Sequence, residues 1–127
     1  MNACKISFDR ALSMVTASDS VNLRLGASPG MPEETHARYR GRPGATIAVL
    51  TFSRFPALPA GQTYQVWARH GATWASLGSM EPDADGNGRL IAESAALATV
   101  PDAVEVTLEP RPGSMTPGPH VVVSWAP

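Results

Sequence analysis

A chain of 127 residues is long enough for one domain that buries about two thirds of the surface of its unfolded chain, so it needs no disulfide or metal to fold. The formal net charge of -1, with ten basic residues scattered along the chain, argues against nucleic acid as a partner, because phosphate binding needs a concentrated positive face. Cys4 is the only cysteine, which excludes an internal disulfide, and no run approaches the ~18 apolar residues of a membrane-spanning helix.

Twelve prolines and eleven glycines are spread along the chain and predict short strands between turns. Residues 1–10 have no clear period and are interpreted as a tail or a first edge strand, and residues 11–17 predict a strand. After the turn chemistry of residues 18–20, the strict alternation of residues 21–25 predicts a half-buried strand whose valine and two leucines point inward.

The least regular segment, residues 26–43, predicts a long connection with a short strand near residues 37–40. His36 lies in this connection, and a lone loop histidine is typically solvated. Residues 45–52 are the most continuously apolar run. Because this run is short and rich in β-branched side chains, it predicts a central strand buried on both faces.

The stretch 58–69 opens with a proline and a glycine and then alternates, which predicts a strand. One face carries Tyr64, Val66 and Ala68, and the other carries Gln65, Trp67 and Arg69. Residues 73–80 predict a second strand, and the short turn between the two strands predicts a hairpin. Gly78 in mid-strand predicts a bulge or the close approach of another backbone.

The rest of the chain predicts one helix among further strands. Residues 81–88 form a polar turn cluster, and residues 93–99 are rich in alanine and predict a helix of about two turns. Further strands are predicted at residues 89–92, 103–109 and 120–125, with a proline- and glycine-rich loop at residues 110–119.

Seven to nine short strands with at most one short helix predict an all-β fold, a two-sheet antiparallel β-sandwich. No alternation of strands and helices supports a parallel sheet. We therefore expect residues 11–127 to form one β-sandwich domain, preceded by residues 1–10.

One turn resembles half of a calcium site. Asp83, Asp85 and Asn87 stand where an EF-hand loop places its first three oxygen ligands, and a glycine follows at the sixth position. The twelfth position is Ser94 instead of glutamate, and a strand rather than a helix precedes the loop. The favoured interpretation is a hairpin turn, and a weak calcium site is the alternative. No other metal and no cofactor is predicted.

Tyr64, Trp67 and Trp74 form a candidate ligand or partner surface, because the two strands that carry them are expected to be neighbours. Packing in the core is the favoured interpretation, since large aromatic side chains dominate core burial.

No catalytic constellation is visible. The chain has no Gly-x-Ser-x-Gly elbow, and His36, His70 and His120 each lie in or beside a predicted loop without a local partner pattern. We predict that the protein is not an enzyme.

Five pieces of the chain, in order and at similar spacing, resemble the C-terminal domain of the anti-sigma-K factor family. They lie at residues 55–67, 76–78, 83–86, 104–110 and 113–119. The clearest is Pro-Ala-Gly-Gln-Thr-Tyr-Gln-Val-Trp within the first piece, and the last two read Val-Glu-Val-Thr-Leu-Glu-Pro and Gly-Ser-Met-Thr-Pro-Gly-Pro. The resemblance covers about residues 12–125.

The resemblance implies a bacterial, membrane-anchored regulator of transcription. In this family a cytoplasmic zinc-binding domain holds an extracytoplasmic-function sigma factor inactive, one helix crosses the membrane, and the domain resembled here lies outside as the sensory part. Proteolysis of the anchor releases the sigma factor. The chain lacks the family's zinc motif and membrane helix, so we expect an extracytoplasmic domain whose sigma factor is bound elsewhere, with a protease or an envelope ligand as its own partner.

An alternative hypothesis from another class is a freestanding secreted or periplasmic module. It would bind a glycan or a peptide through the aromatic surface or the loop at residues 110–119.

Overall fold

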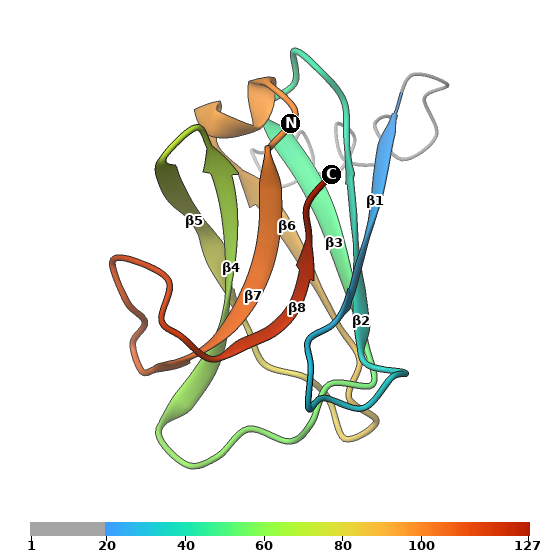
Figure 1. The fold of residues 1–127 in the computed structure, drawn as a ribbon, viewed down its shortest axis with the longest axis vertical. Coiled ribbons are helices and arrows are strands. Elements are labelled where there is room, and N and C mark those ends of the chain that lie inside the picture. The colour runs from blue at the N-terminus through green and yellow to red at the C-terminus, as the bar shows by residue number, and fades with distance from the viewer. Residues whose placement is uncertain (1–19) are drawn as a thin grey trace, which may run out of the picture.

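The computed structural model describes residues 20–127, which form eight strands and one 3-10 turn (Figure 1). The elements are β1 (Val21–Ala27), β2 (His36–Gly41), β3 (Ile47–Ser53), β4 (Gln62–His70), β5 (Thr73–Met80), β6 (Gly88–Glu93), η1 (Ala95–Ala98), β7 (Ala103–Pro110) and β8 (Val121–Trp125). The predicted tail or edge strand at residues 1–10 and the predicted strand at residues 11–17 lie outside the described residues. The other predicted strands are confirmed, with bounds shifted by a few residues.

The strands form one antiparallel sheet in the order β5-β4-β7-β8-β1-β2-β3-β6. β1 joins its two halves, because its first five residues pair with β2 while Gly26 and Ala27 pair with Ser124 and Val123 of β8. The sheet curls until its end strands, β5 and β6, lie on the same side of the molecule (Figure 1). The fold is a nearly closed barrel.

The prediction of an all-β fold is confirmed, but the prediction of two separate sheets is wrong. In a sandwich the two sheets are held together by side chains alone, whereas β1 continues the backbone hydrogen bonding from one half to the other. An alternating strand has the same inward and outward residues in a sandwich and in a barrel, so the sequence pattern does not distinguish the two.

Side chains close the barrel between β5 and β6. A Cβ atom placed on Gly78 would lie 3.4 Å from the methyl carbons of Leu90, and one placed on Gly88 would lie 2.8 Å from the Met80 sulfur. The two glycines therefore leave room for the side chains of the opposite strand. This packing covers the seam where the sheet has no backbone ladder.

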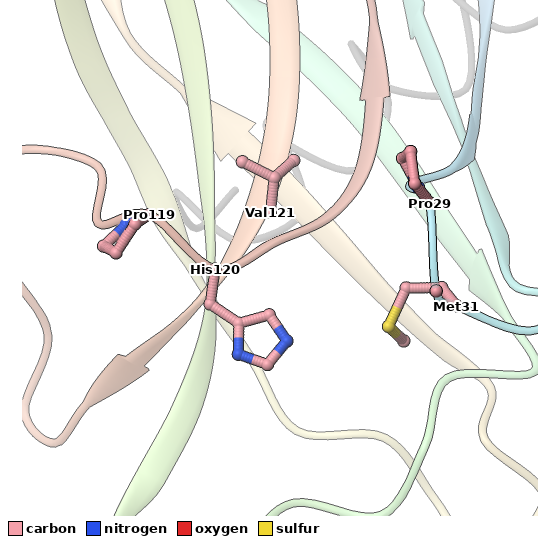
Figure 2. A pocket seen from close by; sticks show the side chains of 6 residues that line it. Pro29, Met31, Pro119, His120 and Val121 are labelled. Carbon is pink, nitrogen blue, oxygen red and sulfur yellow. The ribbon is translucent and has the colours of Figure 1, made fainter.

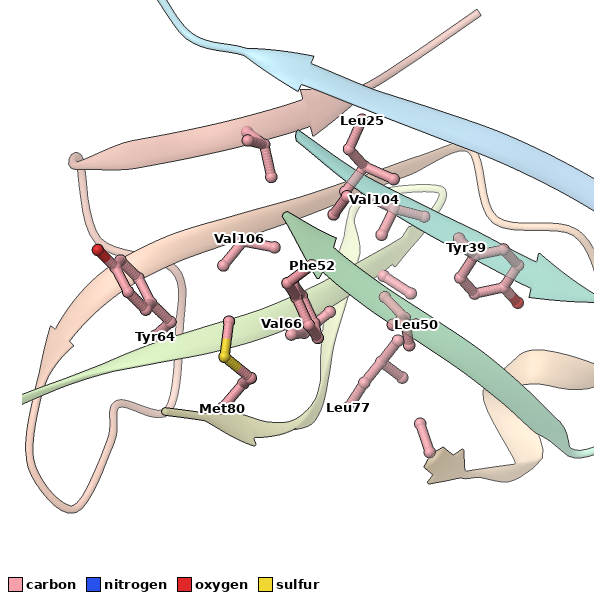
Figure 3. Close-up of a cluster of buried hydrophobic side chains, with 14 of the residues drawn as sticks. Leu25, Tyr39, Leu50, Phe52, Tyr64, Val66, Leu77, Met80, Val104 and Val106 are labelled. Atoms are coloured by element: carbon pink, nitrogen blue, oxygen red, sulfur yellow. The ribbon is translucent and has the colours of Figure 1, made fainter. Parts of the chain in front are cut away.

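The core fills the barrel between the two halves of the sheet (Figure 3). Near one end, the ring of Phe55 meets those of Phe52 and Tyr64 edge to face, at centroid distances of 5.5 and 5.0 Å. The middle contains Leu50, Val66 and Val106, each less than 1% exposed. β3 is buried on both faces from Ile47 to Leu50, as predicted.

The predicted hairpin of β4 and β5 is confirmed, with Gly71 at a φ of 63° in its two-residue turn. The predicted irregularity at Gly78 is confirmed as well, since the register shifts beside it and its φ is 133°. The predicted two-turn helix at residues 93–99 is shorter. Ser94 caps a single 3-10 turn, and Thr99 returns to extended backbone two residues before Pro101.

Candidate functional site

The loop between β7 and β8 folds back over the outer face of β4 and β7. We call its residues 111–119 the strap (Figure 1, orange-red, between β7 and β8). The strap contributes no buried residue of its own, and Met115 near its middle is 95% exposed. It is held instead by polar side chains that rise from the strands beneath it. The two main anchors are Gln65 on β4 and Glu109 on β7.

The side-chain amide of Gln65 binds the strap at Ser114. Its oxygen accepts a hydrogen bond from the Ser114 N–H at 2.9 Å, and its Nε2 donates to the Ser114 carbonyl at 3.0 Å. Nε2 also donates to the Ser76 hydroxyl on β5 at 2.9 Å. Gln65 is only 6% exposed, so these bonds satisfy a polar group that burial would otherwise destabilise. The amide supplies the strap with one donor and one acceptor, as the backbone of a neighbouring strand would.

The carboxylate of Glu109 accepts hydrogen bonds from three neutral donors. The Ser114 hydroxyl donates to Oε1 at 2.7 Å, while the Thr107 hydroxyl and the Gly118 N–H donate to Oε2 at 2.5 and 2.8 Å. Burial at 3% exposure acts to raise the pKa of Glu109, but these three hydrogen bonds outweigh it and hold the pKa below its ordinary value. Glu109 is therefore an ionised, buried anchor.

Trp67 extends this network across the sheet. Its indole N–H donates to the Thr107 hydroxyl oxygen at 2.8 Å, and that hydroxyl donates in turn to Glu109. Trp67 is fully buried although it lies on the outer face of β4. We call this set the Glu109 network: Gln65, Trp67, Thr107, Glu109, Ser114 and Gly118. It joins β4, β7 and the strap.

Two glycines allow the strap to approach its anchors. A Cβ atom on Gly118 would lie 3.0 Å from both carboxylate oxygens of Glu109, and one on Gly113 would lie 3.1 Å from the Gln65 amide oxygen. Gly113 also has a φ of 125°, a backbone conformation that residues other than glycine rarely adopt. The glycines of the strap are thus required by close contact and backbone conformation.

The pKa of Glu105, which lies two residues before Thr107 on β7, is also shifted. Burial raises the pKa of its carboxyl group, the nearby Arg69 guanidinium lowers it, and the charge of Glu109 raises it further. The Arg69 guanidinium lies 5.8 Å from the centre of the Trp74 ring, and its buried Nε has no hydrogen-bond partner among the described residues. Beyond the strap, the outer face of β4 therefore continues with a cation stacked on an aromatic ring.

The structure does not bring the three candidate aromatic residues together on the surface. Tyr64 points into the core, is 2% exposed and donates its hydroxyl to the Pro56 carbonyl at 2.7 Å (Figure 3). Trp67 points the other way and is covered. Trp74 alone of the three is partly exposed. A ligand surface made of all three side chains would require two of them to leave the interior.

The candidate calcium residues form a hydrogen-bonded turn, but the predicted hairpin is wrong, because the flanking strands β5 and β6 are not paired. One carboxylate oxygen of Asp83 accepts from the backbone N–H groups of Asp85 and Asn87, at 2.9 and 3.0 Å. Gly86 has a φ of 83°, and a Cβ atom there would lie 2.6 Å from the Phe55 carbonyl oxygen. Over residues 20–127, no group of three or more histidine, cysteine, aspartate or glutamate side chains is placed to hold a metal ion.

The histidines lie on separate parts of the barrel. His36 begins β2, with Nδ1 2.8 Å from the Glu34 carbonyl, and His70 ends β4, with Nε2 3.2 Å from the Thr99 carbonyl. His120 lines an open cleft of about 430 Å³ beside Pro29 and Met31 (Figure 2). No described hydrogen bond links any of these rings to a carboxylate or a hydroxyl group.

The alternation of the strand put Gln65 on the face opposite Tyr64 and Val66, but the sequence did not identify Gln65 or Glu109 as anchors. A polar residue on the outward face of a strand normally indicates solvent, and only the path of the strap buries these two. The available signal was the Gly-Ser and Pro-Gly steps of the loop, which mark where a backbone must pass close to another group.

A family model described as anti-sigma-K factor rskA, C-terminal, matches residues 10–121. Searches of curated proteins and of solved structures gave no significant match. The matched range includes the whole Glu109 network and both strands that carry its anchors. No helix in the described part of the chain is long and apolar enough to cross a membrane. Because this family model matches most of the chain, the chain belongs to the anti-sigma-K factor C-terminal family.

Proposed function

We propose that this chain is the extracytoplasmic regulatory domain of a bacterial, membrane-anchored anti-sigma factor, and that it is not an enzyme. Family membership supports a role in the control of a sigma factor. The sigma factor would be bound by a cytoplasmic domain outside this sequence. The β-barrel would act on the outer side of the membrane, where its folded state determines how well the anchor resists proteolysis.

One observation carries the non-catalytic part of the proposal. The best-placed polar side chains of the sheet, Gln65, Thr107 and Glu109, are buried. Gln65 and Glu109 bind the strap, and the Thr107 hydroxyl donates to Glu109. A catalytic site needs such groups directed at a space that a substrate can enter. Here the same groups hold a loop against the barrel, which is a structural task.

The mechanism follows from the free energy of folding. A folded barrel denies a protease access to the neighbouring chain, whereas local or global unfolding exposes it. A ligand or partner that binds only one of these states shifts the equilibrium by mass action. Regulation then requires no chemistry in the domain itself.

Location is tested in a bacterium that carries the full-length gene product. Alkaline phosphatase, which requires an oxidising compartment for its disulfides, is fused after residue 127, and a fluorescent protein that matures only in the cytoplasm is fused at the same place in a second strain. We expect phosphatase activity and no fluorescence. Fluorescence without phosphatase activity would place the domain inside the cell and exclude the proposal.

Control through the folded state is tested with a matched pair in the β4–β5 hairpin. Val66 is fully buried, so Val66→Ala leaves a cavity and destabilises the barrel, whereas Ser79 is exposed and Ser79→Ala leaves it intact. In cells with a reporter transcribed by the cognate sigma factor, we expect Val66→Ala alone to raise reporter output. An unchanged reporter, with the loss of stability verified on the purified domain, would refute this mechanism.

A further inference from the structure

The strap is attached to the barrel by polar contacts rather than by apolar burial. None of residues 111–119 is buried, and its most apolar long side chain, Met115, is almost fully exposed. Its middle is held by Gln65 and Glu109. Its first residue, Arg111, donates its backbone N–H to the Gly61 carbonyl and pairs with Glu81 at 2.5 Å, in an ion pair whose side chains are both more than half exposed. Exposed pairs of this kind contribute little to stability.

The residues beneath the strap are buried more completely than those within it. Trp67 and Thr107 are fully buried on the outer face of the sheet, and Gln65 is nearly so. The barrel core lies on the other face of the same strands and does not include the strap. Gln65 and Glu109, which bind the strap, lie on the same outer face as Trp67, so movement of the strap would open that face without disturbing the packing of the core.

We propose that the strap is an acid-released lid: protonation of Glu109 frees residues 112–118 from the outer face of β4 and β7 and uncovers Trp67, while the barrel stays folded.

The geometry links the lid to one proton. Two of the three hydrogen-bond donors on the Glu109 carboxylate, the Ser114 hydroxyl and the Gly118 N–H, belong to the strap. Hydrogen bonds to an ionised carboxylate are roughly twice as strong as those to a neutral group. A proton on the carboxyl group weakens both contacts, and at Oε2 it adds a third hydrogen to the two that already point there. By linkage, the closed strap favours the ionised carboxylate and the added proton favours the open strap.

We assign the release of the strap to Glu109 rather than to the other charged groups near the network. On β7, burial raises the pKa of Glu105, whereas the pKa of Glu109 is lowered, so Glu105 takes up its proton first as the pH falls. On β4, the Arg69 guanidinium lies close enough to Glu105 to lower the pKa of that carboxyl group. The strap has Arg111 at its start, and the exposed His120 follows its end; β8 has no charged side chain between Val121 and Trp125.

The test uses Trp67 as its own probe. Replacement of the two other tryptophans by phenylalanine, Trp74→Phe and Trp125→Phe, leaves one indole in the chain. Acrylamide quenching of its fluorescence is measured from about pH 7 to about pH 3, and far-UV circular dichroism follows the barrel in the same samples. We expect the quenching constant to rise several-fold in acid before the dichroism changes. Trp67 that stays protected until the barrel itself unfolds would overturn the proposal.

Two variants in this background identify the group that titrates. Glu109→Gln removes the ionisable group, so we expect no acid transition in Trp67 quenching. Ser114→Ala removes one strap donor while keeping both backbone bonds to Gln65, so we expect the midpoint of the transition to move to higher pH. Glu34→Gln, at an exposed carboxylate on another loop, is the matched control and should leave the midpoint unchanged. An acid transition that persists in Glu109→Gln would mean that another group releases the strap, and it would overturn the proposed role of Glu109.

Discussion

The side-chain amide of Gln65 binds both backbone groups of Ser114, 49 residues further along the chain. One side chain thereby supplies a donor and an acceptor in the arrangement that a paired strand would provide. A loop rich in proline and glycine is thus held in one place by the strand beneath it. The strength of this contact can be measured directly.

We expect Gln65→Leu to lower the free energy of unfolding by about 2–3 kcal/mol, because three hydrogen bonds of about 1 kcal/mol each are lost and the Ser114 groups lose their partner. Urea denaturation of the purified domain measures this change. Asn22→Leu, at an exposed amide on β1, is the control and should stay within about 0.5 kcal/mol of the parent. Equal effects of the two substitutions would mean that the amide does not hold the strap.

We expect Gly118→Ala to destabilise the domain by about 1–3 kcal/mol, because the new methyl group would lie 3.0 Å from both oxygens of Glu109. In a Glu109→Ala background the same substitution should cost much less, since the group that it displaces is gone. A double-mutant cycle in urea measures the difference. Gly26→Ala, where the nearest atom lies at an ordinary 3.8 Å, is the control. Additive effects at positions 109 and 118 would contradict the contact.

Alkaline pH should destabilise the barrel through its two tyrosines. Burial raises the pKa of Tyr39 to about 12 and also raises that of Tyr64. The folded state therefore keeps these protons longer than the unfolded state, so stability is complete below pH 10 and is lost as the pH rises toward 12. For Tyr39 the shift corresponds to about 3 kcal/mol. Stability curves in urea at several pH values measure this loss, and Tyr39→Phe should reduce it; a loss of equal size in that variant would contradict the assignment.

The turn at residues 83–87 can be tested for a structural or a calcium-binding role. If its hydrogen bonds matter, Asp83→Ala lowers stability by about 1–2 kcal/mol, because one oxygen accepts two backbone N–H groups, while Asp85→Ala stays near the parent. Millimolar calcium or a chelator should leave the melting temperature unchanged. A rise in melting temperature with calcium, abolished by Asp85→Ala, would instead establish a calcium site.

Most strands were predictable from the sequence because their pattern is local. The alternation in β1, β4 and β7 and the apolar run of β3 each identify a strand without knowledge of its neighbours. The pairing of β1 with both β2 and β8 has no such local signal, and it determines that the sheet is a barrel rather than a sandwich. The helix predicted at residues 93–99 was also too long, since the extended backbone at Thr99 and the following Pro101 leave only one 3-10 turn around Leu97.

The Glu109 network could not be predicted from local sequence patterns, for a related reason. Gln65 and Glu109 occupy outward positions on their strands, which normally face water. Their burial depends on a loop that crosses the sheet and meets them 49 and five residues away along the chain. The glycines of that loop were visible in the sequence, but the groups that they approach were not.

The pairing of β1 with β8 also determines how the molecule resists mechanical force. The two strands are antiparallel neighbours joined by only two residue pairs, and β1 begins at the same end of the barrel at which β8 finishes (Figure 1). A pull between residues 20 and 127 therefore loads these pairs one after the other, as in the opening of a zipper. The β1 residues nearest to residue 20 pair with β2, and the β8 residues nearest to residue 127 pair with β7, so these neighbouring strands hold β1 and β8 while the two pairs open. Tension between these two residues would separate β8 from β1 first, because the contact between them is the shortest in the sheet.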